Sequence, residues 1–284
     1  MEYLILLFIV LAQAGCGIFT KLYNIKTGNR SAFVYSGIAS LVAAIFFLIT
    51  SKKPEFTPAF LGYSAGFAIA YATSLICTAM AVRYGPIALT TLMTSLALMI
   101  PTLYGIICLK ESVGISLILG LLMLVLSLCL INLKKDNEKV SPKWALFAGL
   151  AFLGNGMCST IQKMEQVSFN GTYKNEFMIV ALLMVSAVAF IIAFATEKKE
   201  IYYCVKKGAL YTILYGISNG ILNLLVMVLG GIMPASIMFP LISAFGIIGS
   251  FLIGRFMFKE KLNPMQLAGL FAGIVSIVFF NLVV

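Results

Sequence analysis

The chain has 284 residues, of which 61% are hydrophobic and only 11% are charged, and its mean hydropathy is +1.05. A water-soluble domain has about 45–50% apolar and about 25% charged residues, so this composition excludes a soluble globular protein. The net charge of +10 is spread over short connections between apolar stretches. That dispersal is typical of membrane helix ends and excludes a nucleic-acid-binding surface.

Ten apolar stretches follow one another along the chain. Each is close to the length of about 20 residues that a membrane-spanning helix needs. They lack the period-two alternation of a membrane β-barrel. We therefore predict an all-α integral membrane protein with ten transmembrane helices. These helices are expected at residues 3–22, 31–50, 58–81, 86–109, 113–133, 143–164, 175–196, 208–229, 234–257 and 263–283.

The fifth and tenth predicted helices have related sequences. At an offset of 149, seven of the 24 positions from 110 to 133 are identical to their partners, more than the two or three that a small apolar alphabet would produce. A duplicated half built from membrane helices is typical of many transporters. The identical positions are Lys110, Glu111, Gly120, Leu121, Ser127, Asn132 and Leu133.

The first helices of the two halves match at an offset of 142, where Gln13 and Lys21 correspond to Asn155 and Lys163. The difference between the offsets, 149 − 142 = 7, places a seven-residue insertion in the second half, near Asn170.

Each half has five predicted helices, and five is an odd number. The second half must then enter the membrane from the opposite side, which makes the halves inverted repeats. We expect the first repeat at 1–135, a charged linker at 136–142 and the second repeat at 143–284.

This arrangement resembles the drug/metabolite transporter superfamily, specifically its EamA-like ten-helix branch, over the whole chain. The resemblance rests on diffuse motifs: a small, polar first helix ending in lysine in each half (Ala14 to Lys21, Gly154 to Lys163), Pro101 in the fourth helix, and a Lys-Glu turn before the last helix of each half. It implies secondary transport, with amino acids and related metabolites as substrates. The second half departs from the pattern, because Pro240 does not align with Pro101.

Polar side chains inside a bilayer are costly unless they face other helices or a water-filled cavity, so they indicate where a substrate could bind. Serine and threonine can instead bond their own helix backbone or bridge two helices. Amides are harder to satisfy within one helix. The candidate substrate-binding residues are Gln13, Lys21, Tyr71, Ser74, Thr78, Thr91, Thr94, Asn155, Ser159, Lys163, Asn219 and Asn223.

Two features near these residues have alternative interpretations. Lys21 and Lys163 lie near the ends of their helices, where they either extend to the lipid headgroups or attract a substrate carboxylate. Pro101 and Pro240 can kink the fourth and ninth helices, and backbone carbonyls freed there can face a substrate.

The residue types that the sequence lacks disfavour several further classes of function. The chain has no histidine, and we expect no Asp or Glu well inside any helix. This disfavours proton-coupled cation efflux through a buried carboxylate, and it disfavours a membrane enzyme. The six cysteines have no metal-binding spacing and no phosphate-binding glycine loop occurs, so we expect no cofactor, no metal and no ATP hydrolysis.

The sequence thus predicts a secondary transporter that moves small polar metabolites by alternating access at a central cavity between the inverted repeats. Amino acids or related zwitterionic or anionic compounds are the expected substrates. The alternative is a membrane subunit that does not transport, or that acts only in a pair. The expected partners are the lipid bilayer, the substrate and, in a dimer, a second copy or a related chain.

The distribution of Lys and Arg predicts the orientation, because cytoplasmic loops are enriched in both. With the N-terminus inside, the cytoplasmic loops would hold 5 of the 20 Lys and Arg residues and the opposite loops the other 15. Both termini are therefore predicted outside, in the plasma membrane, although the resemblance implies both inside. A fluorescent protein that folds poorly after export, fused after Val284, should stay dark in intact bacteria. Bright cells would contradict this orientation.

Overall fold

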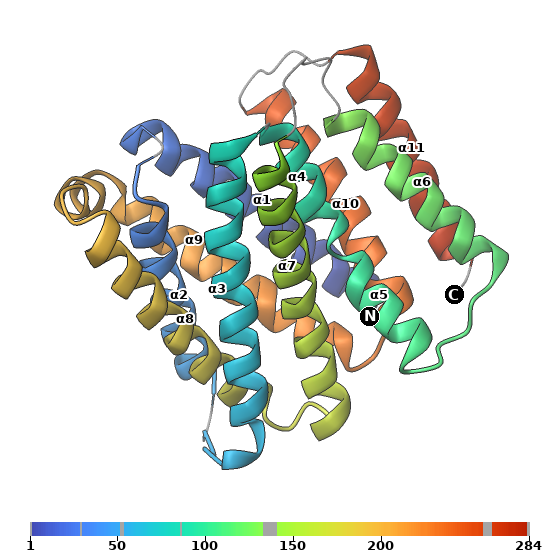
Figure 1. The fold of residues 1–284 in the computed structure, drawn as a ribbon. Helices are drawn as coiled ribbons and strands as arrows, with labels where there is room; N and C mark the ends of the chain where they lie inside the picture. Colours follow the sequence, from blue (N-terminus) through green and yellow to red (C-terminus); the bar gives the residue numbers. More distant parts are fainter. Residues whose placement is uncertain are drawn as a thin grey trace. The chain divides into compact units, whose positions relative to one another are not determined.

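The computed structural model describes residues 2–28, 30–51, 54–85, 87–132, 141–257 and 263–282, and these residues form helices and no strands (Figure 1). A single 3-10 turn, η1 (Pro58–Phe60), leads into one of the helices. The helices are α1 (Glu2–Thr27), α2 (Ala32–Thr50), α3 (Leu61–Tyr84), α4 (Ile87–Leu96), α5 (Met99–Ile107), α6 (Ile115–Asn132), α7 (Pro142–Phe169), α8 (Lys174–Thr196), α9 (Ile201–Gly230), α10 (Ala235–Phe256) and α11 (Pro264–Asn281).

Eight helical segments in the described part of the chain are long and apolar enough to cross a membrane. Two further apolar helices, at Ile115–Ile131 and Pro264–Phe280, are shorter. The predicted all-α, multi-pass membrane character is therefore confirmed. Large apolar side chains remain exposed on these helices, such as Ile49 and Ile115, each 78% exposed. Lipid is the solvent in which such exposure costs nothing.

The helices group into two compact units. Unit 1 comprises Met1–Ala72 and Met164–Gly231, and unit 2 comprises Thr73–Lys163 and Ile232–Val284. In unit 1, α1 packs on α9, and α2 packs on α8 and α9. In unit 2, α6 packs on α11, and α5 packs on α10. Each unit therefore combines helices from the first and second halves of the chain.

One contact in unit 1 joins positions that are 149 residues apart. In unit 1, the Ser186 hydroxyl donates to the carbonyl of Gly37 at 2.9 Å, across 149 residues. The ring of Phe190 fills the space above Gly37, where an added Cβ would lie 3.1 Å from it. Helices α2 and α8 consequently approach closely through a glycine and a hydroxyl (Figure 1).

Helices α6 and α11 in unit 2 contact each other reciprocally. Gly120 on α6 faces the ring of Phe280, and Gly269 on α11 faces Ile131. Gly120 and Gly269 are 149 apart, and so are Ile131 and Phe280. In addition, the Ser127 hydroxyl donates to the Gly269 carbonyl at 2.6 Å. The two glycines thus allow one pair of helices to pack closely at two matching places.

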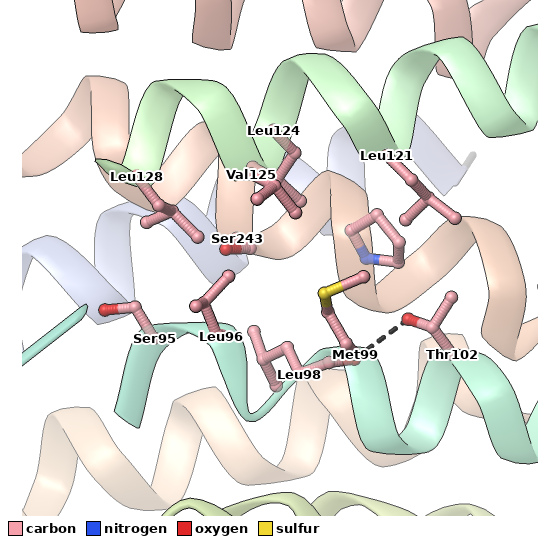
Figure 2. Close-up of a pocket in the computed structure, with 11 residues that line it drawn as sticks. Ser95, Leu96, Leu98, Met99, Thr102, Leu121, Leu124, Val125, Leu128 and Ser243 are labelled. Carbon is pink, nitrogen blue, oxygen red and sulfur yellow. Dashed lines mark hydrogen bonds between the residues drawn. The ribbon is translucent and has the colours of Figure 1, made fainter. Parts of the chain in front are cut away.

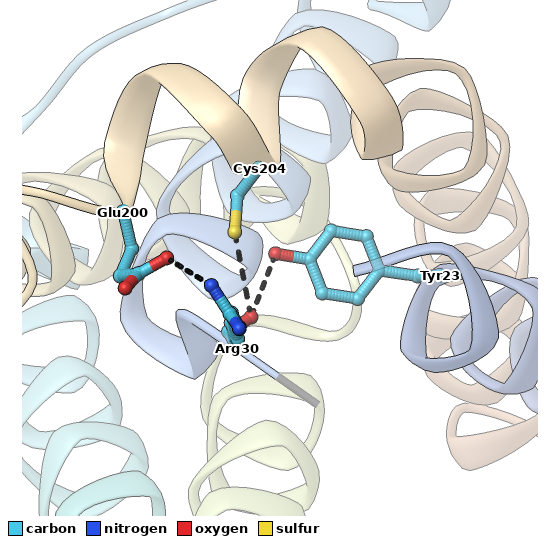
Figure 3. Close-up of polar contacts among 4 residues, drawn as sticks. All are labelled: Tyr23, Arg30, Glu200 and Cys204. Carbon is cyan, nitrogen blue, oxygen red and sulfur yellow. Dashed lines mark hydrogen bonds and ion pairs between the residues drawn. The ribbon is translucent and has the colours of Figure 1, made fainter. Parts of the chain in front are cut away.

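Within unit 1, an ion pair and a hydrogen bond join the α1–α2 connection to the start of α9. Arg30 pairs with Glu200 at 3.2 Å, and the Arg30 carbonyl accepts from the Tyr23 hydroxyl at 3.1 Å and from the Cys204 thiol at 3.8 Å (Figure 3). Exposed ion pairs contribute little stability, so the buried hydroxyl of Tyr23 contributes more to holding this connection than the charges do.

We predict that Gly269→Ala destabilises the protein by about 1–3 kcal/mol, because overpacking a closely packed contact costs that much. A methyl group at Gly269 would lie 2.7 Å from Ile131 and 3.0 Å from the Ser127 carbonyl oxygen. Unfolding in mixed micelles measures the change in free energy. Gly149→Ala is the matched control, since nothing lies within 4 Å of a Cβ there. Equal stability of both variants would contradict this packing.

Candidate functional site

The fourth predicted helix, expected as one segment at 86–109, is instead two helices. Helix α4 ends at Leu96 and α5 begins at Met99. Proline has no backbone N–H, so Pro101 cannot donate to the carbonyl of Ala97 as a continuous helix requires. That carbonyl accepts from the N–H of Ile100 at 3.0 Å instead. The predicted effect of Pro101 therefore appears as a break three to four residues before it.

A helix end leaves its last four carbonyls without partners in the helix, and Asn155 supplies one such partner. Its amide Nδ2 donates to the Thr94 carbonyl at 2.9 Å. Gly156, the next residue on α7, allows the close approach, because an added Cβ there would lie 2.6 Å from the Ala97 carbonyl oxygen. Two predicted site residues, Thr94 and Asn155, are thus brought together at the helix break within unit 2.

A pocket lies beside this break, between α4–α5, α6 and α10, all in unit 2 (Figure 2). The residues that line the pocket include leucines, Met99, Ser95, Thr102 and Ser243. The Leu98 carbonyl accepts from both the Thr102 hydroxyl at 2.8 Å and the Thr102 N–H at 3.4 Å. The surface of the pocket itself is apolar. None of the residues that line this pocket is among the candidate substrate-binding residues predicted from the sequence.

In unit 1, polar side chains gather on α1 and α9, which pack together. The amide oxygen of Gln13 is buried and accepts no hydrogen bond among the residues the structure describes. On α9, Asn223 donates to the side-chain oxygen of Asn219 at 3.0 Å and to its carbonyl at 2.8 Å. A buried amide oxygen without a donor is rare in folded proteins and calls for an explanation. A bound polar molecule would provide one.

Tyrosines form a second polar group in unit 1 that sequence reasoning missed. The rings of Tyr23 and Tyr35 lie 4.5 Å apart, and those of Tyr35 and Tyr215 lie 5.0 Å apart. The Tyr35 hydroxyl bonds Thr20 at 2.8 Å. Their wide spacing in the sequence gave no signal of this cluster, because the packing of α1, α2 and α9 creates it.

The remaining predicted residues have varied surroundings. The Thr94 hydroxyl donates to the carbonyls of Thr90 and Thr91, as the backbone-bonding alternative for threonine proposed. Lys21 on α1 and Tyr71 on α3 are half-buried in unit 1, and Thr91 is exposed. Ser74, Thr78 and Ser159 are half-buried in unit 2.

Lys163 lies inside unit 2, with only 6% of its surface exposed, and its ammonium donates to the Met233 carbonyl at 3.0 Å. Close by along α10, the Glu111 carboxylate accepts from the N–H groups of Ala235 at 2.8 Å and Ser236 at 2.7 Å. A carboxylate at a helix N-terminus is favourable because of the helix dipole. Glu111, from the predicted Lys-Glu turn, thus holds the start of α10.

One buried acid was missed. The predicted helix 143–164 continues as α7 to Phe169, so its last turns include Glu165, which was not predicted to be in a helix and is 0% exposed. The polar run around Lys163 and Gln166 made the helix appear to end early. No group of three or more His, Cys, Asp and Glu residues that could hold a metal occurs in the described part of the chain.

Comparisons with known proteins support the fold alone. No family model matches the chain, and no curated protein matches it. A solved structure described as "Crystal structure of protein" is similar, with a TM-score of 0.80 and 13% sequence identity. The match covers 99% of this chain and 97% of the other. The chain therefore shares its fold with a protein of known structure over nearly its whole length.

We predict that Asn155→Leu destabilises the protein by about 1–3 kcal/mol, the cost of leaving a buried carbonyl without its donor. Unfolding in mixed micelles tests this. Met157→Leu, a conservative change at a 39% exposed position of the same helix, is the control and should have no effect. If Asn155→Leu is as stable as the control, the amide does not support the helix break.

Proposed function

We propose that this protein is a secondary transporter of small polar metabolites, with amino acids or related zwitterionic or anionic compounds as its substrates. The chain would cross the membrane ten times, as two inverted five-helix repeats, and would expose its binding residues to each side of the membrane in turn.

The observation that carries this proposal is the interrupted helix of unit 2. Irregular backbone at membrane depth is tolerated where protein or a water-filled cavity surrounds it. In many transporters, discontinuous helices supply backbone groups to the substrate or the coupling ion. Here the break between Leu96 and Met99 adjoins a pocket, and Asn155 donates a hydrogen bond to it from α7.

The repeated contacts support the inverted-repeat part of the proposal. An axis that relates two halves brings equivalent helices face to face where it passes between them. Helices α2 and α8 meet at Gly37 and Ser186, which are equivalent positions. Helices α6 and α11 meet twice, at Gly120 with Phe280 and at Gly269 with Ile131. These reciprocal contacts are those expected of a two-fold axis. The equivalence of α6 and α11 also favours counting both short apolar helices as membrane spans.

The polar groups of unit 1 favour a substrate that donates hydrogen bonds. The Gln13 amide oxygen is an acceptor without a donor in the described residues, and it fits the ammonium group of an amino acid. The half-buried Lys21 lies two turns further along α1 and offers a positive charge for a carboxylate. An amino acid carries both groups, so the chemistry of α1 agrees with the substrate class that the family resemblance implies.

The experiment is uptake of a panel of labelled amino acids by liposomes that contain this chain alone. We expect saturable uptake, and we expect Gln13→Leu to lower kcat/KM about tenfold or more, since one hydrogen bond to a charged group is worth about 1.5–3 kcal/mol. Lys21→Ala should raise KM for the same substrates. Glu55→Gln, at an exposed position of the α2–η1 connection, is the control and should behave as wild type.

Unchanged apparent affinity in both Gln13→Leu and Lys21→Ala would remove α1 from the binding site. Complete lack of uptake by the wild-type chain, with folding confirmed by size-exclusion chromatography, would contradict the proposed substrate class.

A further inference from the structure

Glu165 is a fully buried acid in the last turns of α7. Its side chain is 0% exposed. One carboxyl oxygen, Oε2, accepts from the Gln166 amide at 2.7 Å. The other, Oε1, is buried and has no hydrogen-bond partner among the described residues. A carboxylate has room for about four hydrogen bonds, so this group is far from satisfied as an anion.

Two charged groups of the described residues act on Glu165. They are Glu176 and Lys174, both on α8 in the same unit. Glu176 is itself buried, at 6% exposure, and it has the same sign of charge. The Ser51 hydroxyl approaches Glu176 at 3.4 Å and supplies only a neutral partner. Among the described residues, the carboxyl group of Glu176 raises the cost of a charge on Glu165, and the ammonium group of Lys174 lowers it.

Two buried carboxylates that face each other rarely both ionise, because repulsion adds to the cost of leaving water. Isolated burial of an anion costs far more than burial of a neutral polar group, and the usual response is to take up a proton. Of the two acids, Glu165 is the more buried and has the empty oxygen. A proton on Glu165 removes both the charge and the repulsion, so the neutral acid fits this arrangement.

Glu165 lies close to the point at which α7 leaves unit 2. Unit 2 ends at Lys163 and unit 1 resumes at Met164, and the Lys163 ammonium donates to the Met233 carbonyl of unit 2. If the chain opens to each side in turn as proposed above, water that reaches Glu165 would let it release its proton.

We propose that Glu165 is a proton-binding site that couples transport to the proton gradient. This proposal rests on the proposed transport function. It differs from the expectation from the sequence, which disfavoured coupling to protons through a buried carboxylate. The carboxylate takes one proton from water on one side of the membrane, becomes a neutral acid while buried, and returns that proton to water on the other side. No other reactant is needed.

Infrared difference spectroscopy of the reconstituted protein tests the proton itself and needs no substrate. At neutral pH the wild-type chain should show the C=O band of a protonated carboxylic acid, which shifts in heavy water. Glu165→Gln should lack this band, and the exposed control Glu55→Gln should retain it. Glutamine has the size of the neutral acid, so Glu165→Gln should fold. Glu165→Asp is the second variant and should show the band at a shifted position.

Flux measurements in the same liposomes test the coupling. A proton gradient should drive accumulation of a transported amino acid in wild type and in Glu55→Gln. Glu165→Gln should lose this accumulation completely, yet still exchange labelled for unlabelled substrate without a gradient. Exchange that persists while accumulation is lost separates a failure of coupling from a failure of transport.

Three outcomes would overturn the proposal: the protonated band persists in Glu165→Gln, accumulation survives in that variant, or a sodium gradient drives the wild type in place of a proton gradient. If no amino acid on the panel is transported, the proposed substrate class fails separately. The infrared band then decides whether Glu165 binds a proton.

Discussion

Every backbone polar group at membrane depth needs a partner within the protein, and this constraint governs the structure described here. Continuous helices meet it automatically, but the chain departs from it between Leu96 and Met99. Asn155 and the N–H of Ile100 each donate to a carbonyl at the break. Partners from α7 and from the start of α5 thus satisfy the irregular backbone, as membrane depth requires.

Much of the fold could be predicted because membrane helices leave a strong signal in composition. Nine of the ten predicted stretches each correspond to one helix, and the ends agree within three residues except in α1, α7 and α9. Those three extend into polar, charged sequence, such as the runs around Lys26, Lys163 and Lys206, where hydropathy no longer indicates the helix. The repeat offset of 149 could also be found from sequence. The direct contact between the equivalent positions Ser186 and Gly37 could not be predicted in this way.

The candidate site could be predicted only in part. Side-chain type identified Asn155 and Thr94, but not the carbonyl that joins them, since a helix break depends on how Pro101 and Gly156 pack. The tyrosine cluster depends on tertiary packing alone. Glu165 was missed because burial of an acid at a polar helix end has no sequence signature; the neighbouring Lys163 and Gln166 resemble a helix terminus in water.

The composition of the two units constrains how the protein can be made. Neither half of the chain contains a complete unit, since α1 and α2 pack on α8 and α9, and α5 and α6 pack on α10 and α11. Ser186 is synthesised 149 residues after Gly37, so α2 is in the membrane before its partner helix α8 has been made. At about 5–20 residues per second, that delay is on the order of ten seconds. During this interval the glycines that later pack against partner helices contact lipid or the insertion machinery instead.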